Sequence, residues 1–155
     1  MSEFVHERET IFPIVMACLN MSKQRVGALI VLQNNLPLND FVRTGELINA
    51  KISQRLIENI FFKNSPLHDG AMIVSNNRIS SARCVLPVSD ALHLPPQYGL
   101  RHRAGLGLTE VTDAKVVIVS EETGDIALAV CGTLYERLSP QELKARLSEP
   151  AEKSA

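Results

Sequence analysis

"AMIVSNNRISSARCVL", residues 71–86, contains two apolar runs separated by the polar segment 76–78. An asparagine-rich connection between two apolar runs predicts a β-hairpin, because asparagine tolerates the left-handed backbone that a tight turn requires. The centre of this turn is then Asn76-Asn77. The Asp-Gly pair at residues 69–70, itself a common hairpin turn, lies before the first strand and must have another role.

Apolar runs of strand length recur on both sides of this hairpin. "GALIVLQ", residues 27–33, is a continuous apolar run opened by glycine, which is typical of a strand covered on both faces. "KVVIVS" at 115–120 and "IALAVCG" at 126–132 flank the turn sequence "EETGD". These two runs predict a second antiparallel pair.

Two helices are predicted in the first half of the chain. Residues 10–22 are expected to be helical, with Thr10 as the N-cap and Pro13 in the first turn. Ser53 is expected to cap a second helix. The apolar stripe of that helix faces the core and consists of Leu56, Ile57, Ile60 and Phe61.

Two further helices are predicted in the second half. Pro95 and Pro96 predict a helix start near Gln97, with the segment continuing to about Thr109. The four residues from Ser139 to Glu142 form a capping box with proline at the first helical position. Its helix is expected to bury Leu143 and Leu147.

These elements predict one α/β domain: a central mixed, largely antiparallel β-sheet flanked by helices. The chain of 155 residues is long enough for one hydrophobic core, which we place at about residues 10–148 of a single domain over 1–155. Residues 150–155 are read as a polar C-terminal tail.

The overall composition excludes several classes of protein. Hydrophobic residues make up 45% and charged residues 21%, so intrinsic disorder is not expected. A net charge of −1 argues against bulk capture of nucleic acid or of an anionic membrane. The apolar run at residues 11–19 is too short to cross a bilayer, so we expect a soluble chain without an export signal. Cys18, Cys84 and Cys131 are read as buried thiols of a reducing compartment.

The first polar cluster is His68-Asp69-Gly70-Ala71, at the entry of the strand that begins near residue 71. A carboxylate beside an imidazole can bind a divalent cation or accept a proton. The two small residues leave space for a ligand close to the backbone. Taken alone, the cluster could equally be a charged loop end.

The second cluster is Arg101-His102-Arg103, near the start of a predicted helix. Guanidinium groups and helix N-terminal amides suit phosphate oxygens, although a solvated helix face is the plainer interpretation. Because successive helical residues point about 100° apart, the three side chains are not expected to reach one ligand equally.

The third cluster is Ser120-Glu121-Glu122, at the end of the run 115–120. Acidic residues before a turn are common and need no function. If this strand runs antiparallel to residues 71–75, however, its end lies at the same sheet edge as Asp69. Acidic and basic groups would then converge on one cleft, as metal-assisted phosphoryl transfer requires.

Together these segments resemble the diadenylate cyclase domain, which makes cyclic di-AMP from two ATP molecules. The resemblance is to the class whose catalytic domain follows a membrane anchor, and it covers about residues 10–135. It rests on "RVGALIVL", "INAKISQRLIENIFFKNSPLHDGAMIV", "GLRHRAGLGLTEVTDA" and "VIVSEETGDIAL".

The resemblance implies roles for the three clusters. Asp69 would promote attack by a ribose 3′-hydroxyl, directly or through Mn²⁺ or Mg²⁺, and His68 would bind that metal with it. The other residues with a catalytic role would surround the triphosphate and support metal placement. They are Arg101, His102, Arg103 and Glu122. The substrate-binding residues would be Gly70, Ala71, Leu86, Pro87, Leu100, Ser120 and Glu121, with Leu86 and Pro87 at the adenine.

Two positions differ from the family pattern. Leu100 stands where members often have a hydroxyl residue, so one phosphate hydrogen bond would be lost. Val85 stands where an aromatic residue often stacks on adenine, which affects base affinity or selectivity.

The resemblance also implies partners and a location. ATP would be the substrate, cyclic di-AMP the product and a facing homodimer the active state, with no nucleic acid partner. The location would be cytoplasmic, or the cytoplasmic face of the membrane if an upstream anchor was removed. A non-catalytic module that binds ATP or cyclic di-AMP is the alternative function, and a nucleotide hydrolase is a weaker third.

Overall fold

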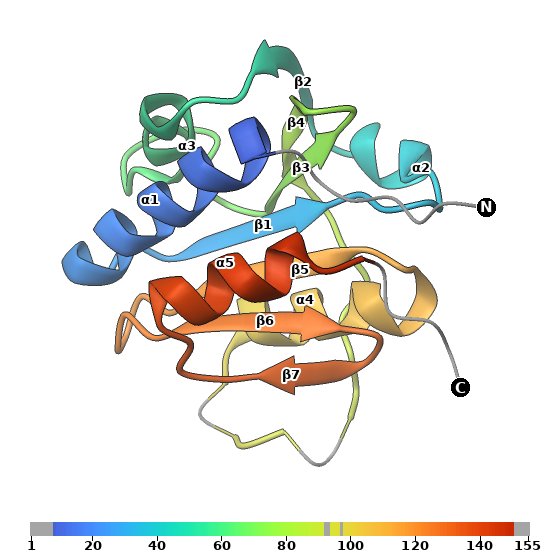
Figure 1. The fold of residues 1–155 in the computed structure, drawn as a ribbon. Helices are drawn as coiled ribbons and strands as arrows, with labels where there is room; N and C mark the ends of the chain where they lie inside the picture. The colour runs from blue at the N-terminus through green and yellow to red at the C-terminus, as the bar shows by residue number, and fades with distance from the viewer. Residues whose placement is uncertain (1–7, 92–93, 97, 151–155) are drawn as a thin grey trace.

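A seven-stranded sheet in the order β2-β4-β3-β1-β5-β6-β7 forms the centre of the computed structural model (Figure 1). The structure describes residues 8–91, 94–96 and 98–150. The strands are β1 (Ala28–Leu32), β2 (Glu46–Lys51), β3 (Ala71–Ser75), β4 (Arg78–Cys84), β5 (Lys115–Val119), β6 (Ile126–Val130) and β7 (Thr133–Tyr135). The helices are α1 (Arg8–Gln24), α2 (Asn39–Val42), α3 (Gln54–Phe61), α4 (Leu100–Val111) and α5 (Pro140–Ser148).

The two faces of the sheet are covered by different helices (Figure 1). Side chains alternate between the faces of a strand, so Ile30 packs with α1, α3 and α5, while Leu29 and Val31 pack with α4. Every residue of β1 is buried, as the continuous apolar run predicted. The prediction of a mixed, largely antiparallel sheet flanked by helices is confirmed.

The strand directions bring three chain segments together at one end of the central strands. β1 pairs with β3 in parallel and with β5 in antiparallel orientation. The starts of β1 and β3 and the end of β5 therefore lie together. β5 does run antiparallel to β3, which is the condition for the clusters to converge, although the two strands are related through β1 and are not direct neighbours.

Local signals fixed most of the helix and turn positions. The β3–β4 hairpin turns at Asn76 and Asn77, both in the left-handed backbone region, with φ of 53° and 59°. The Ser53 hydroxyl accepts a hydrogen bond from the Leu56 N–H, so it caps α3 as predicted. The capping box at the start of α5 is also present.

Two helix starts were predicted wrongly. α1 begins before Thr10, whose hydroxyl donates to Asn77 Oδ1 at 2.7 Å and so ties the helix to the hairpin turn. α4 begins at Leu100 because the Tyr98 N–H first closes a turn onto the Pro95 carbonyl oxygen. Gln97, the predicted start, lies outside the described residues, as does most of the predicted tail.

Two strands were not predicted from the sequence, and one cysteine expected to be buried is exposed. β2 and β7 are the two edge strands. Their residues are exposed or half-buried and produce no apolar run. Cys131 lies in the turn after β6 and is exposed, whereas Cys18 and Cys84 are buried as expected.

Candidate active site

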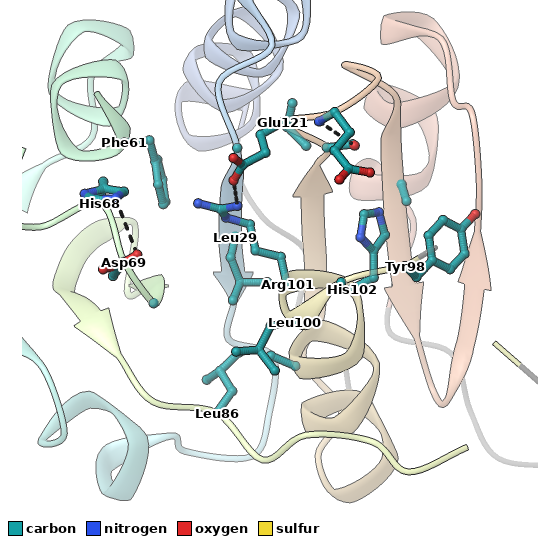
Figure 2. A pocket seen from close by; sticks show the side chains of 18 of the residues that line it. Leu29, Phe61, His68, Asp69, Leu86, Tyr98, Leu100, Arg101, His102 and Glu121 are labelled. Carbon is teal, nitrogen blue, oxygen red and sulfur yellow. Dashed lines mark hydrogen bonds and ion pairs between the residues drawn. The ribbon is translucent and has the colours of Figure 1, made fainter. Parts of the chain in front are cut away.

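A cavity of about 820 Å³ opens at the end of the sheet where the starts of β1 and β3 meet the end of β5 (Figure 2). The third polar cluster and parts of the first and second lie in its wall. The predicted site residues that line it are His68, Asp69, Gly70, Leu86, Leu100, Arg101, His102, Ser120, Glu121 and Glu122. Ala71, Pro87 and Arg103 are not among its lining residues.

His68 and Asp69 form a pair at the mouth of β3, with 3.4 Å between His68 Nε2 and Asp69 Oδ1 (Figure 2). His68 Nδ1 lies 2.7 Å from the Ser65 carbonyl oxygen. A carbonyl oxygen can only accept, so Nδ1 is protonated, and in the neutral ring Nε2 keeps its lone pair. The lone pair and the Asp69 carboxylate thus face the same space.

Gly70 turns the chain from this pair into β3. Its φ of 89° lies in the region that favours glycine, and a Cβ there would be 2.7 Å from the Cys84 carbonyl oxygen. The Asp-Gly sequence therefore serves a tight turn at the strand entry, next to the β4 end. Ala71 follows as the first, fully buried residue of β3.

Arg101 enters the cavity from the first turn of α4 (Figure 2). Its Nη1 donates to Glu121 Oε1 at 2.5 Å, which connects the second cluster with the third. The guanidinium is the first cause of a lowered pKa of the Glu121 carboxyl, which therefore stays ionised at neutral pH. The pair leaves further guanidinium N–H donors for a ligand, because the group has five.

His102 points into the cavity beside Arg101, and its ring stacks on Tyr98 with centroids 4.4 Å apart and planes at 12° (Figure 2). Burial, and then the charge of Arg101, lowers the pKa of His102. The imidazole is therefore neutral at neutral pH. In that form, a ring nitrogen can donate to a phosphate oxygen without adding charge.

Arg103 points away from the other two members of its cluster. Its Nη1 donates to the Ala91 carbonyl oxygen at 3.3 Å, and its own carbonyl oxygen accepts from the Ser89 N–H. These contacts hold the segment before α4 against the helix. Arg103 points away from Arg101 and His102 because successive side chains on a helix point in different directions.

The third cluster is a structured turn after β5. The Ser120 hydroxyl accepts hydrogen bonds from the N–H groups of Glu122 and Thr123, each at 3.2 Å. The Ser120 N–H donates to the Asp125 carbonyl oxygen at 3.0 Å, which closes the turn. This arrangement places the Glu121 and Glu122 carboxylates at the cavity.

An apolar rim, formed by residues after the end of β4 and at the start of α4, completes the cavity. Leu86 is buried in its wall, while Val85, Val88 and Leu100 line it with more than half of each side chain's surface exposed. Pro87 packs against α4 instead, where a Cβ on Gly107 would be 2.1 Å from the Pro87 carbonyl oxygen. The rim can cover a flat apolar group such as a base.

Several lining residues were not predicted from the sequence. Lys63, Arg83 and Arg137 add cations, and Tyr98 adds the ring that supports His102. Arg83 and Arg137 both have left-handed backbones, with φ of 59° and 53°. No local pattern marks these positions, because only the tertiary fold brings them to the cavity.

Within the described residues, no group of three or more His, Cys, Asp or Glu side chains could hold a metal ion. Asp69 offers a carboxylate, which suits both Mn²⁺ and Mg²⁺, and His68 adds an imidazole, a ligand better suited to Mn²⁺ than to Mg²⁺. A metal here would need further ligands from a bound substrate. None of the helices in the described part of the chain has the length and apolar character that crossing a bilayer needs.

One cavity of this α/β domain brings together a carboxylate–imidazole pair, an arginine and an apolar rim. These groups suit the phosphates and the base of a nucleotide, which places the domain in the class of nucleotide-binding proteins. Comparison with known proteins agrees. Residues 15–134 match the family described as "DisA bacterial checkpoint controller nucleotide-binding", and the chain belongs to this family.

Named relatives support this membership. Cyclic di-AMP synthase CdaA of Bacillus subtilis is 42% identical over 96% of this chain and 54% of the relative. A diadenylate cyclase of Listeria monocytogenes is 49% identical over 79% of this chain and 45% of the relative. The chain thus spans about half the length of the curated relatives it matches.

The fold matches solved structures as well. DacA of Staphylococcus aureus, crystallised as a double cysteine mutant, superposes with a TM-score of 0.88 at 42% identity. The match covers 89% of this chain and 92% of that one. A structure titled as a hypothetical membrane spanning protein from Bacillus cereus gives a TM-score of 0.78, also at 42% identity, over 81% of this chain and 62% of that one.

Proposed function

We propose that residues 1–155 act as one catalytic domain, a diadenylate cyclase that condenses two ATP molecules into cyclic di-AMP and two pyrophosphates. The observation that carries the proposal is the His68–Asp69 pair in the same cavity as the Arg101–Glu121 pair. The His68–Asp69 pair would supply a general base and metal ligands. Arg101 would supply the positive charge that binds phosphate. The named activities of the relatives support the same function.

In the proposed reaction, each ribose 3′-oxygen forms a bond to the α-phosphorus of the other ATP. The bond from that phosphorus to pyrophosphate breaks, and the 3′-hydroxyl proton passes to Asp69. Arg101 offsets the negative charge of the phosphates, and the neutral His102 donates to a phosphate oxygen. Glu122 and Ser120 support the placement of the triphosphate from the turn after β5.

The donor set fits a divalent metal that is shared with the substrate. The residues that would hold Mn²⁺ or Mg²⁺ are His68, through Nε2, and Asp69. Mg²⁺ is commonly bound by one or two carboxylates and substrate phosphates, so two protein ligands suffice. When bound, the metal would neutralise phosphate charge and favour the 3′-alkoxide.

The cavity volume of about 820 Å³ suits one nucleotide in each chain. Two ATP molecules that attack each other therefore require two chains whose cavities face in an isologous homodimer. Because ATP is the substrate, we place this reaction in the cytoplasm or at the cytoplasmic face of a membrane. Leu86 would cover the adenine, with the exposed Val85 beside it.

Incubation of the purified chain with ATP and Mn²⁺, followed by chromatography, tests the proposal. Cyclic di-AMP and pyrophosphate in a ratio of one to two are expected. A module that only binds nucleotide yields no new nucleotide, and a hydrolase yields ADP or AMP. Either result would reject the cyclase function.

The arginines of the second cluster should differ in their effect on ATP binding. Arg101→Ala removes a charged donor from the cavity and should weaken binding by about 1.5–3 kcal/mol. Arg103 is not among the lining residues, and it donates to the Ala91 carbonyl oxygen. Arg103→Ala is therefore the matched control and should change the Kd, measured by calorimetry, by less than about threefold. Equal losses in both variants would contradict this assignment.

A further inference from the structure

Gly27, the residue before β1, lies directly under the guanidinium of Arg101. A Cβ built on Gly27 would be 2.5 Å from Arg101 Nη1, 2.6 Å from Cζ and 3.0 Å from Nε. No side chain could occupy that space while Arg101 keeps its position. The guanidinium thus packs on bare backbone at the floor of the cavity.

The backbone gives no other reason for a glycine at this position. Among the described glycines, only Gly70, Gly124 and Gly132 have positive φ, so Gly27 has a conformation that alanine also adopts. Gly45 and Gly107 differ in another way, since a Cβ on either would meet a backbone carbonyl oxygen at 2.1 Å. At Gly27 the nearest atoms all belong to a flexible side chain.

Arg101 is held from a second direction by Glu121, whose Oε1 accepts from Nη1. The Arg101 side chain keeps only 24% of its surface exposed. The glycine backbone below and the carboxylate beside it together define where the guanidinium lies. A methyl group at residue 27 would move the guanidinium and disturb the bond to Glu121, yet it would leave the sheet unchanged.

We propose that Gly27 is a positioning residue, which sets the Arg101 guanidinium for contact with the triphosphate. This inference rests on the proposed function, because it takes ATP as the ligand of Arg101. Gly27 would therefore affect nucleotide affinity only through the position of the Arg101 side chain.

A double-mutant cycle tests it, with Gly27→Ala, Arg101→Ala and both together. The probe is 3′-deoxy-ATP, which lacks the attacking hydroxyl, so binding is measured by calorimetry without turnover. Gly27→Ala should weaken binding at least about fivefold, and Arg101→Ala at least about tenfold. In the Arg101→Ala background the added methyl should change the Kd by less than about twofold.

Stability separates positioning from a structural role. Gly27→Ala should unfold at a urea concentration no lower than the parent, because alanine reduces the freedom of the unfolded chain and only a flexible group must move.

The outcomes are distinct. If the parent does not bind 3′-deoxy-ATP, the proposed function fails. If the parent binds and Gly27→Ala binds equally well, or loses as much affinity without Arg101 as with it, the positioning role is rejected while the proposed function stands.

Discussion

Asp69→Asn should lower the rate of cyclic di-AMP formation by about two orders of magnitude or more, with folding and ATP binding retained. The side chain is 80% exposed at the strand mouth, so asparagine fits without strain. The amide can neither accept the 3′-hydroxyl proton nor bind a metal as a carboxylate does. Losing a positioned general base typically costs 10²–10⁴-fold.

Product formation by the purified variant, measured by chromatography, checks this result. Asp40→Asn is the matched control, because Asp40 pairs with Arg43 on the exposed surface of α2, away from the cavity. Such pairs contribute little, so this variant should turn over like the parent. Near-parent turnover by Asp69→Asn would remove Asp69 from the reaction.

Removal of divalent metal should stop turnover completely and reversibly. The described residues provide two ligands at most, His68 and Asp69, so we expect weak metal binding by the protein alone and tighter binding with nucleotide. EDTA should therefore abolish product formation, and excess Mn²⁺ should restore it. The free Mn²⁺ signal in electron paramagnetic resonance should fall when protein and 3′-deoxy-ATP are added together.

His68→Ala separates a protein-held metal from one that merely accompanies ATP. Loss of a ligand should raise the Mn²⁺ concentration for half-maximal rate by about tenfold or more. Full turnover in excess EDTA would contradict the metal proposal. An unchanged Mn²⁺ requirement in His68→Ala would exclude His68 as a ligand.

The sequence predicted the inner strands well because their signal is local. A strand buried on both faces, such as β1, needs a continuous apolar run wherever it lies in the chain. The edge strands β2 and β7 have no such signal, because they pair on one side only and leave much of their surface exposed. Helix starts depended on turns that propensity does not encode, as the Tyr98–Pro95 bond before α4 shows.

The site was predictable where its chemistry lies in short polar runs. His68-Asp69 and Glu121-Glu122 stand at strand ends, so a guess at strand direction was enough to bring them together. Arg83 and Arg137 could not be found this way, because each is a single arginine with a left-handed backbone that no sequence pattern marks. The contact of Arg101 with Gly27 joins α4 to β1 and is visible only in three dimensions.

In the proposed dimer, each chain activates the 3′-hydroxyl of its own ATP, and that oxygen attacks the α-phosphorus of the ATP on the other chain. This division of labour is tested by a titration of parent chain with Asp69→Asn chain, after subunit exchange is confirmed. In a mixed dimer only one hydroxyl is activated, so one phosphodiester forms and the second does not.

A linear dinucleotide with a 5′-triphosphate should accumulate as the variant is added in excess. Cyclic di-AMP per parent chain should fall in the same titration, because parent chains become trapped in mixed pairs. A constant yield of cyclic di-AMP per parent chain, whatever the amount of exchanged variant, would contradict the facing-dimer mechanism.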